Sequence, residues 1–290
     1  MPDLPHSNDK SLVNEMSEDL LLEQLDDGVL TLTLNRPERL NALNPPLLRL
    51  LREAMERATR NHEARVVVIG GAGRAFCAGG DIAGKPEKKG DGAESKVEKK
   101  RAPDSVATRI EWLRGNMEAV RLLHQMDKPT IAMIRGATVS VGMALAAACD
   151  FRVVSETASF TTGFAKVGFS GDYGASYFLT RLLGTAKARE LMFLSDMLDA
   201  REAERIGLVS QLVADAELED RTRALARRLA DGPPITYRFM KKNLNAAVDG
   251  SLEQILDLEA THMVLSAMTN DQREAVKAFM EKRKPQFTGA

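Results

Sequence analysis

The sequence contains few cysteines and no long apolar run. Its two cysteines, Cys77 and Cys149, lie far apart and form no C-x-x-C pattern, so neither a disulfide framework nor a cysteine-ligated metal site is predicted. So few cysteines are typical of a protein that works in a reducing environment, and a cytoplasmic location is expected. No run of about eighteen apolar residues is present, which excludes a membrane-spanning helix.

Charge of one sign is not in excess either. The 40 lysines and arginines nearly balance the 41 aspartates and glutamates, and the formal net charge is −1. Nucleic-acid-binding domains that depend on overall charge are clearly basic, so no nucleic-acid partner is expected. Residues 1–19 are polar and acidic rather than basic and then apolar, so they differ from a signal peptide and predict a mobile tail.

Apolar runs alternate with helical periodicity over residues 20–213, and this alternation predicts an α/β core. Asp26-Asp27-Gly28 between two apolar runs predicts a β-hairpin. Asn44-Pro45-Pro46 predicts the start of a helix that continues to about residue 61, with Asn44 as its N-cap. The other expected elements are strands over residues 20–25, 29–34, 66–69, 130–134 and 151–154, and a helix over about 106–126.

Two segments differ from this core. Residues 85–101 are rich in lysine and glutamate and have few apolar side chains, which predicts a flexible, solvated insertion, unless its lysines meet phosphate groups of a ligand. Residues 214–290 carry helical periodicity only, and predict a C-terminal helical region that packs on the core or on a neighbouring subunit. The helices expected there lie near residues 218–229, 235–248, 252–268 and 269–282.

Two glycine-containing turns follow buried strands. The first is Ala78-Gly79-Gly80-Asp81, and the second is Ser140-Val141-Gly142 at the start of an apolar helix. Backbone N–H groups at a helix start lack partners within the helix, and two converging donors can hold a carbonyl oxygen as it becomes an oxyanion. The alternative is that the glycines simply let strands turn into helices. A dinucleotide site at Gly71 is not favoured, because Phe76 stands where the third glycine of that motif would fall.

Six motifs, one of which contains the first turn, resemble the crotonase, or enoyl-CoA hydratase/isomerase, superfamily over about residues 20–287. The motifs are Asn35-Arg36-Pro37-x-Arg39-x-Asn41-Ala42, Phe76 to Asp81, Ala144-Leu145-Ala146 through Cys149-Asp150, Gly184-x-x-x-Ala188, Ala200-x-x-Ala203-x-x-x-Gly207-Leu208-Val209, and Ala278-Phe279-x-x-Lys282-Arg283-x-Pro285-x-Phe287. The resemblance implies a ClpP-like spiral of ββα units that assembles into homotrimers or homohexamers. It also implies acyl-CoA substrates and no separate cofactor or metal, since coenzyme A is part of the substrate.

The resemblance assigns roles to individual positions. The positions that match the two oxyanion-binding N–H groups are Gly80 and Val141, although the family usually has glycine at Ser140 and glycine or alanine at Val141. The positions that match contacts to coenzyme A are Arg39, Ala78, Asp81 and Lys282. Lys282 corresponds to a cation that approaches the coenzyme of the same or a neighbouring subunit.

The acid–base residues depart most from the family. The hydratases use two glutamates, and the matching positions here are Ala144 and Phe164, which cannot ionise. Asp172 remains, in Gly168-Phe169-Ser170-Gly171-Asp172-Tyr173-Gly174, where dienoyl-CoA isomerases and 1,2-epoxyphenylacetyl-CoA isomerases carry an aspartate. The chain is therefore expected to be an isomerase with Asp172 as its base. The expected acyl pocket consists of Ala144, Phe164, Phe169 and Tyr173, and the last three are candidates for an apolar wall that raises the pKa of Asp172.

Several alternatives remain open from the sequence. Asp172 could be a helix N-cap, since an amphipathic run follows it. The chain could instead be an atypical enoyl-CoA hydratase, a non-catalytic acyl-CoA binding protein, or a hydrolase with Asp172 as nucleophile. His6, His62, His124 and His262 lie outside catalytic motifs and are expected to be structural or exposed. The acyl group itself is not specified.

Overall fold

The computed structural model describes residues 20–81 and 105–290. Its main sheet has six strands in the order β1-β2-β3-β4-β6-β9. The first pair is antiparallel and the other pairs are parallel. The strands are β1 (Leu21–Asp26), β2 (Val29–Leu34), β3 (Val66–Gly71), β4 (Thr130–Ile134), β6 (Phe151–Ser155) and β9 (Gln211–Val213). The tail at 1–19 and the insertion at 85–101 lie outside the described residues.

The predicted hairpin is confirmed. Asp26 pairs with Val29 across a two-residue turn. Asp27 and Gly28 have φ values of 47° and 81°, the left-handed backbone that such a turn requires. The hairpin forms one edge of the sheet, and β2 continues into parallel pairing with β3.

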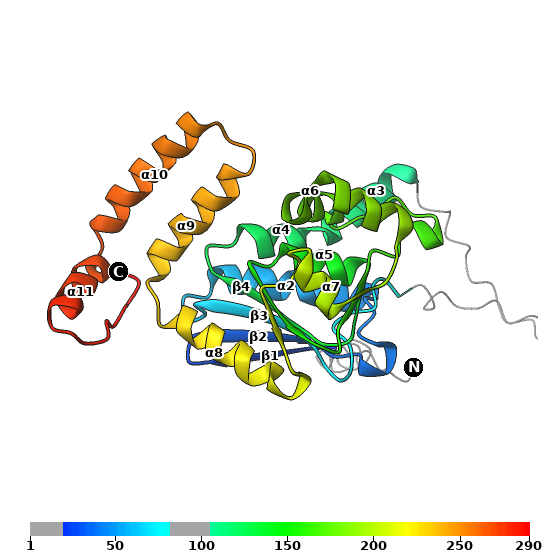
Figure 1. Ribbon diagram of the computed structural model, residues 1–290, viewed down its shortest axis with the longest axis horizontal. Helices are drawn as coiled ribbons and strands as arrows, with labels where there is room; N and C mark the ends of the chain where they lie inside the picture. The colour runs from blue at the N-terminus through cyan, green and yellow to red at the C-terminus, as the bar shows by residue number, and fades with distance from the viewer. Residues whose placement is uncertain (1–19, 82–104) are drawn as a thin grey trace, which may run out of the picture.

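Each face of the sheet is covered by helices (Figure 1). On β3, Val67 and Ile69 face the main core, while Val66 and Val68 belong to a second cluster with α8 (Leu218–Ala230). This alternation follows from the two-residue repeat of a strand. Helix α2 (Pro45–Arg60) contributes to the main core and begins as predicted, since the Asn44 side chain accepts a hydrogen bond from the Leu47 N–H at 3.0 Å.

The prediction of a single helix over residues 106–126 is wrong in one respect, because the helix is interrupted at Met117. It forms α3 (Val106–Asn116) and α4 (Glu118–Gln125). Gly115 and Asn116 precede the break, and both are weaker helix formers than alanine or leucine. Helix α4 buries three side chains against the core, whereas α3 buries none. The break therefore separates α4, which packs on the core, from α3, of which Leu113 alone packs in part against the core cluster among the described residues.

A smaller sheet and three helices complete the core. The sheet consists of β5 (Ala137–Val139), β7 (Ser159–Thr161) and β8 (Leu198–Asp199). Helix α5 (Val141–Ala148) is buried along its whole length. Helix α6 (Ala175–Leu194) is kinked at Gly184, and α7 (Ala200–Arg205) follows β8. Short 3-10 turns lie at η1 (Pro37–Arg39), η2 (Ala165–Val167) and η3 (Asp215–Glu217).

The last three helices extend from the core as an arm (Figure 1). They are α9 (Pro234–Ala247), α10 (Leu252–Ala267) and α11 (Asn270–Met280), close to the predicted bounds. Lys241 of α9 is buried and fixes the arm to the core, because its Nζ lies 2.8 Å from Asp150 Oδ2 and donates to the carbonyl of Leu123. Helix α10 buries no residue. No helix in the described part of the chain is long and apolar enough to span a membrane.

Candidate active site

The first turn is braced by the segment that contains the Asn35-Arg36-Pro37 motif. Buried Asn41 donates from Nδ2 to the carbonyls of Ala72 and Ala75, at 2.9 and 2.7 Å, and its Oδ1 accepts from the Arg36 N–H. Arg36 also forms an ion pair with Asp81 at 2.8 Å, and both side chains are nearly inaccessible. Asp81, predicted as a coenzyme contact, thus ties the two segments together. Sequence reasoning missed this pair, because 45 residues separate the partners.

The second turn has an unusual backbone. Ser140 has φ 53° and ψ −116°, a conformation that is strained for any residue except glycine. Its N–H donates to the Thr161 carbonyl at 3.0 Å, and its carbonyl accepts from Ala144 at 3.1 Å. These bonds hold the chain in position as it enters α5. The strained residue, Ser140, stands where the family usually has glycine. The turn therefore keeps this backbone conformation without the glycine that would relieve the strain.

The two turns lie against each other. The Val139 N–H donates to the Cys77 carbonyl at 2.9 Å, and a Cβ atom on Gly79 would lie 3.1 Å from Ser140 Cβ. Within the described part of the chain, the N–H groups of Gly80 and Val141 donate to no other group. Val141 is the first residue of α5, so its N–H also lies at the positive end of a helix dipole. The turns therefore carry two unused backbone donors, and their role as an oxyanion site stays a prediction.

Contact between the turns depends on Gly142. A Cβ atom there would lie 2.8 Å from Cys77 Cβ and closer still to the Cys77 carbonyl oxygen, whereas a Cβ on Gly80 would meet nothing within 4 Å. We expect Gly142→Ala to reduce the free energy of unfolding by about 1–3 kcal/mol through overpacking, although alanine is the better helix former. Gly80→Ala is the matched control and should change it by less than about 0.5 kcal/mol. Denaturant titration measures both, and equal stability of the two variants would contradict the packing described.

Asp172 lies in a loop with several left-handed residues. Gly168, Gly171, Tyr173 and Gly174 all have positive φ, and the loop leads from η2 into α6. The alternative that Asp172 is the helix N-cap is wrong, because Gly174 is the N-cap and no side chain caps this helix. The left-handed turn at Tyr173 and Gly174 separates the Asp172 side chain from the first turn of α6. The Asp172 carboxylate is therefore not used to cap the helix.

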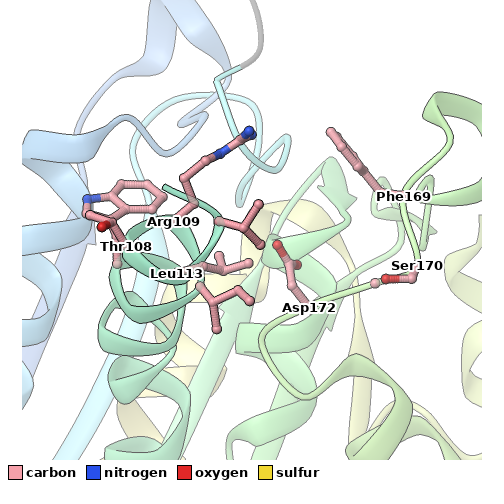
Figure 2. A pocket seen from close by; sticks show the side chains of 10 residues that line it. Thr108, Arg109, Leu113, Phe169, Ser170 and Asp172 are labelled. Atoms are coloured by element: carbon pink, nitrogen blue, oxygen red, sulfur yellow. The ribbon is translucent and has the colours of Figure 1, made fainter. Parts of the chain in front are cut away.

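The Asp172 carboxylate faces an apolar cavity. The cavity has a volume of about 710 Å³ and lies between α3 and residues 169–172 (Figure 2). Within the described residues, Asp172 Oδ1 is buried and has no hydrogen-bond partner. Burial raises the pKa of this carboxyl group above its ordinary value, because the charged form loses hydration. A desolvated carboxylate of this kind is a candidate general base.

The predicted acyl-pocket residues divide into two groups. Phe169 lines the cavity and is 64% exposed. Phe164, Tyr173 and Ala144 are buried, at 3%, 3% and 0% exposed. A Cβ atom on Gly171 would lie 3.5 Å from the Phe164 ring, so the Phe164 ring packs close to the loop that carries Asp172. Burial raises the pKa of Tyr173 above its ordinary value, and the charges of Asp172 and Cys77 raise this pKa further.

Sequence reasoning missed the opposite wall of the cavity, which belongs to α3. Val106, Ile110 and Leu113 recur at helical spacing and line the cavity together with Trp112. The available signal was this apolar stripe beside the Gly115-Asn116 break. Gly80 and Val141 are not among the described residues that line this cavity. The structure therefore brings the two turns together, and it brings Asp172 together with Phe169 and α3.

The predicted coenzyme contacts lie in different parts of the structure. Arg39 is exposed on η1, and Ala78 is half-buried with its N–H bound to the Leu40 carbonyl at 2.9 Å. Lys282 is exposed just after α11, on the opposite side of the molecule from α3 (Figure 1). Lys282 is therefore far from the cavity of its own chain. Its predicted role requires the site of a neighbouring subunit.

The cysteines and His124, which could be reactive, pack against other side chains instead. Burial raises the pKa of both Cys77 and Cys149 to about 12, so neither is a ready nucleophile. His124 packs edge-on against the rings of Tyr177 and Phe178, with centroids at 5.9 and 5.3 Å. Within residues 20–81 and 105–290, no group of three or more His, Cys, Asp or Glu side chains could hold a metal ion.

Solved structures define the fold class. The chain superimposes on enoyl-CoA hydratase from Bacillus anthracis with a TM-score of 0.81 and 29% sequence identity, over 93% of this chain and 100% of that one. A similar match, with a TM-score of 0.81 and 30% identity, covers 92% of this chain and 99% of an enoyl-CoA hydratase from Polaromonas sp. JS666. The α/β architecture is the crotonase fold, as the sequence motifs predicted.

The sequence comparisons define the family. The family model for enoyl-CoA hydratase/isomerase matches residues 24–290. The chain is 34% identical to 1,2-epoxyphenylacetyl-CoA isomerase of Escherichia coli (strain K12), over 93% of this chain and 99% of that protein. The chain belongs to the enoyl-CoA hydratase/isomerase family of the crotonase superfamily, and it is an acyl-CoA enzyme. Its relatives include both isomerases and hydratases, among them a crotonyl-CoA hydratase of Syntrophomonas wolfei at 30% identity.

Proposed function

We propose that this enzyme is an isomerase that shifts a double bond, or rearranges an acyl-CoA thioester, through an enolate. The observation that carries the proposal is the Asp172 carboxylate, whose Oδ1 is buried and without a hydrogen-bond partner among the described residues, in an apolar cavity. Ala144 and Phe164 occupy the positions of the hydratase glutamates, so neither can replace Asp172 as a base.

The proposed reaction needs a single base. On a 3-enoyl thioester, Asp172 takes a proton from C2, and the electron pair moves into a dienolate that ends on the thioester oxygen. The Gly80 and Val141 N–H groups stabilise that oxygen, where negative charge develops. Protonated Asp172 then returns the proton to C4, and the product is the 2-enoyl thioester. A raised pKa favours both steps, because the carboxyl group must accept a proton and release it near neutral pH.

Nuclear magnetic resonance in heavy water tests the proposal. An isomerase of this kind should exchange the C2 and C4 protons of a 3-enoyl-CoA for deuterium while it forms the 2-enoyl product. Binding of the substrate without exchange or conversion would contradict the proposal, and it would favour an acyl-CoA binding protein instead.

A hydratase is the second candidate, because several relatives, including the Syntrophomonas wolfei protein, are named hydratases. Hydration needs one group to activate water and one to protonate the α-carbon. With Ala144 and Phe164 at the usual positions, the described site offers Asp172 alone. Steady formation of 3-hydroxyacyl-CoA from a 2-enoyl-CoA, well above background, would favour the hydratase.

We also propose that the chain assembles as a homotrimer or homohexamer, in the cytoplasm and without a nucleic-acid partner. Large apolar side chains are exposed on the arm, including Met263, Phe279 and Met280 at 72%, 81% and 75%. Apolar surface of this extent is typical of an interface between subunits.

Light scattering should give three or six times the chain mass of 31.8 kDa. The double variant Phe279→Asp/Met280→Asp should reduce that mass and Lys277→Glu should not, whereas a monomeric wild type would contradict the assembly.

A further inference from the structure

We infer that the acyl group of the substrate is large and apolar, with about eight or more carbons, and that α3 selects it. This inference rests on the proposed function, because it names the substrate class of the same site. It starts from the wall opposite Asp172, whose residues no sequence motif identified.

Most of the stripe on α3 has no apolar partner among the described residues, and only Leu113 packs in part against the main core. Val106, Ile110 and Trp112 are 75%, 63% and 53% exposed, and α3 buries none of its residues. An 11-residue helix is marginal by itself in water and normally depends on burial of its apolar face. Phe169 adds a further exposed ring from the loop that carries Asp172, and Figure 2 shows this loop facing α3 across the cavity. These side chains form one apolar surface on both sides of the carboxylate.

A molecule that binds to this apolar surface must also suit a position next to the Asp172 carboxylate. Asp172 lines the same cavity as the stripe, so a molecule that covers α3 also lies against this residue. The described polar side chains around the cavity are Thr108, Arg109, Ser170 and Asp172. The substrate of an acyl-CoA enzyme meets this requirement, with its acyl chain along α3 and its acidic carbon next to Asp172.

The size of the cavity favours a long acyl chain. A cavity of about 710 Å³ is within the range that holds drug-sized ligands. If a carbon takes roughly the 30 Å³ that a water molecule occupies in the liquid, a four-carbon acyl group fills less than a fifth of that space. Four further methylenes would bury additional surface of Ile110 and Leu113.

The test measures binding in the Asp172→Asn variant, so that turnover does not interfere. Calorimetry with saturated butanoyl-, octanoyl- and dodecanoyl-CoA is expected to show affinity that increases about 15- to 200-fold from four to eight carbons, for half to full burial of each methylene. Equal affinity for butanoyl- and octanoyl-CoA would overturn the inference. Failure of proton exchange in the wild type would overturn the proposed function instead, so the two outcomes are distinguishable.

Variants of the wall identify where the chain binds. Ile110→Ala and Leu113→Ala should each weaken octanoyl-CoA binding about 5- to 20-fold and leave butanoyl-CoA binding within about twofold. Leu244→Ala is the matched control, because Leu244 is 69% exposed on α9 of the arm. Equal losses for both ligands, or no loss in either α3 variant, would show that α3 does not bind the acyl chain.

Discussion

Asp172→Asn is expected to lower the rate of C2 proton exchange about 10²- to 10⁴-fold, the usual contribution of a positioned general base. Asparagine has nearly the same shape as aspartate but cannot accept the proton. Because the Asp172 side chain does not cap α6, the substitution removes no helix cap. The loss should therefore appear in kcat, with acyl-CoA binding retained. Nuclear magnetic resonance in heavy water, with wild type and variant side by side, measures the exchange.

The same variant should be as stable as the wild type at neutral pH, or more stable. Burial raises the pKa of Asp172 in the folded protein, so the folded state holds this proton more tightly than the unfolded state does. The stability of the wild type consequently falls as pH rises from the unfolded pKa of Asp172 to its folded pKa, and stays lower above that window. Asparagine carries no charge to bury, so its advantage should vanish below the window.

Asp257→Asn on the exposed helix α10 is the control, because it removes an aspartate without touching the cavity. It should leave the rate of C2 proton exchange unchanged. Proton exchange by Asp172→Asn at the rate of the wild type would show that another group is the base.

The activity of the wild type should rise with pH through a midpoint above the ordinary aspartate pKa, since only the ionised carboxylate accepts a proton.

Val141→Pro is expected to lower kcat about 10²- to 10³-fold, which is the usual cost of removing one oxyanion donor. Val141 is the first residue of α5, where proline is tolerated because the N–H group has no partner within the helix. Ser140 has φ 53° and ψ −116°, outside the β/PPII region that a following proline favours, and the proline Cδ would meet the Ser140 Cβ. The comparison is therefore made in a Ser140→Gly background, which removes that Cβ and suits this backbone. The substitution therefore removes the donor while the backbone keeps its path.

Val141→Ala is the matched control, since it shortens the side chain but retains the N–H group. It should keep kcat within about a factor of ten, and both variants should show the circular dichroism spectrum of the wild type. A folded Val141→Pro enzyme with unchanged kcat would show that this N–H group does not stabilise the enolate.

The sequence by itself determined the elements that depend on short-range chemistry. The hairpin follows from Asp27 and Gly28, which adopt left-handed backbone readily, and the start of α2 follows from the Asn44 side chain three residues before the N–H that it binds. Val66–Gly71 forms a buried strand because its β-branched residues suit a sheet covered on both faces. The ordered motifs also predicted the superfamily, which the fold and the comparisons confirm.

Tertiary structure decided the features that depend on residues far apart in the chain. The Arg36–Asp81 pair and the Lys241–Asp150 pair join residues 45 and 91 positions apart, and no local pattern identifies such partners. The apolar stripe of α3 has the same spacing as a core-facing stripe, but in the structure it precedes the break at Met117 and lines a cavity. Asp172 likewise fits a helix cap by sequence, and the left-handed turn at Tyr173 and Gly174 leaves its carboxylate facing that cavity. Local propensity fixes which elements form, whereas long-range packing fixes which side chains share a site.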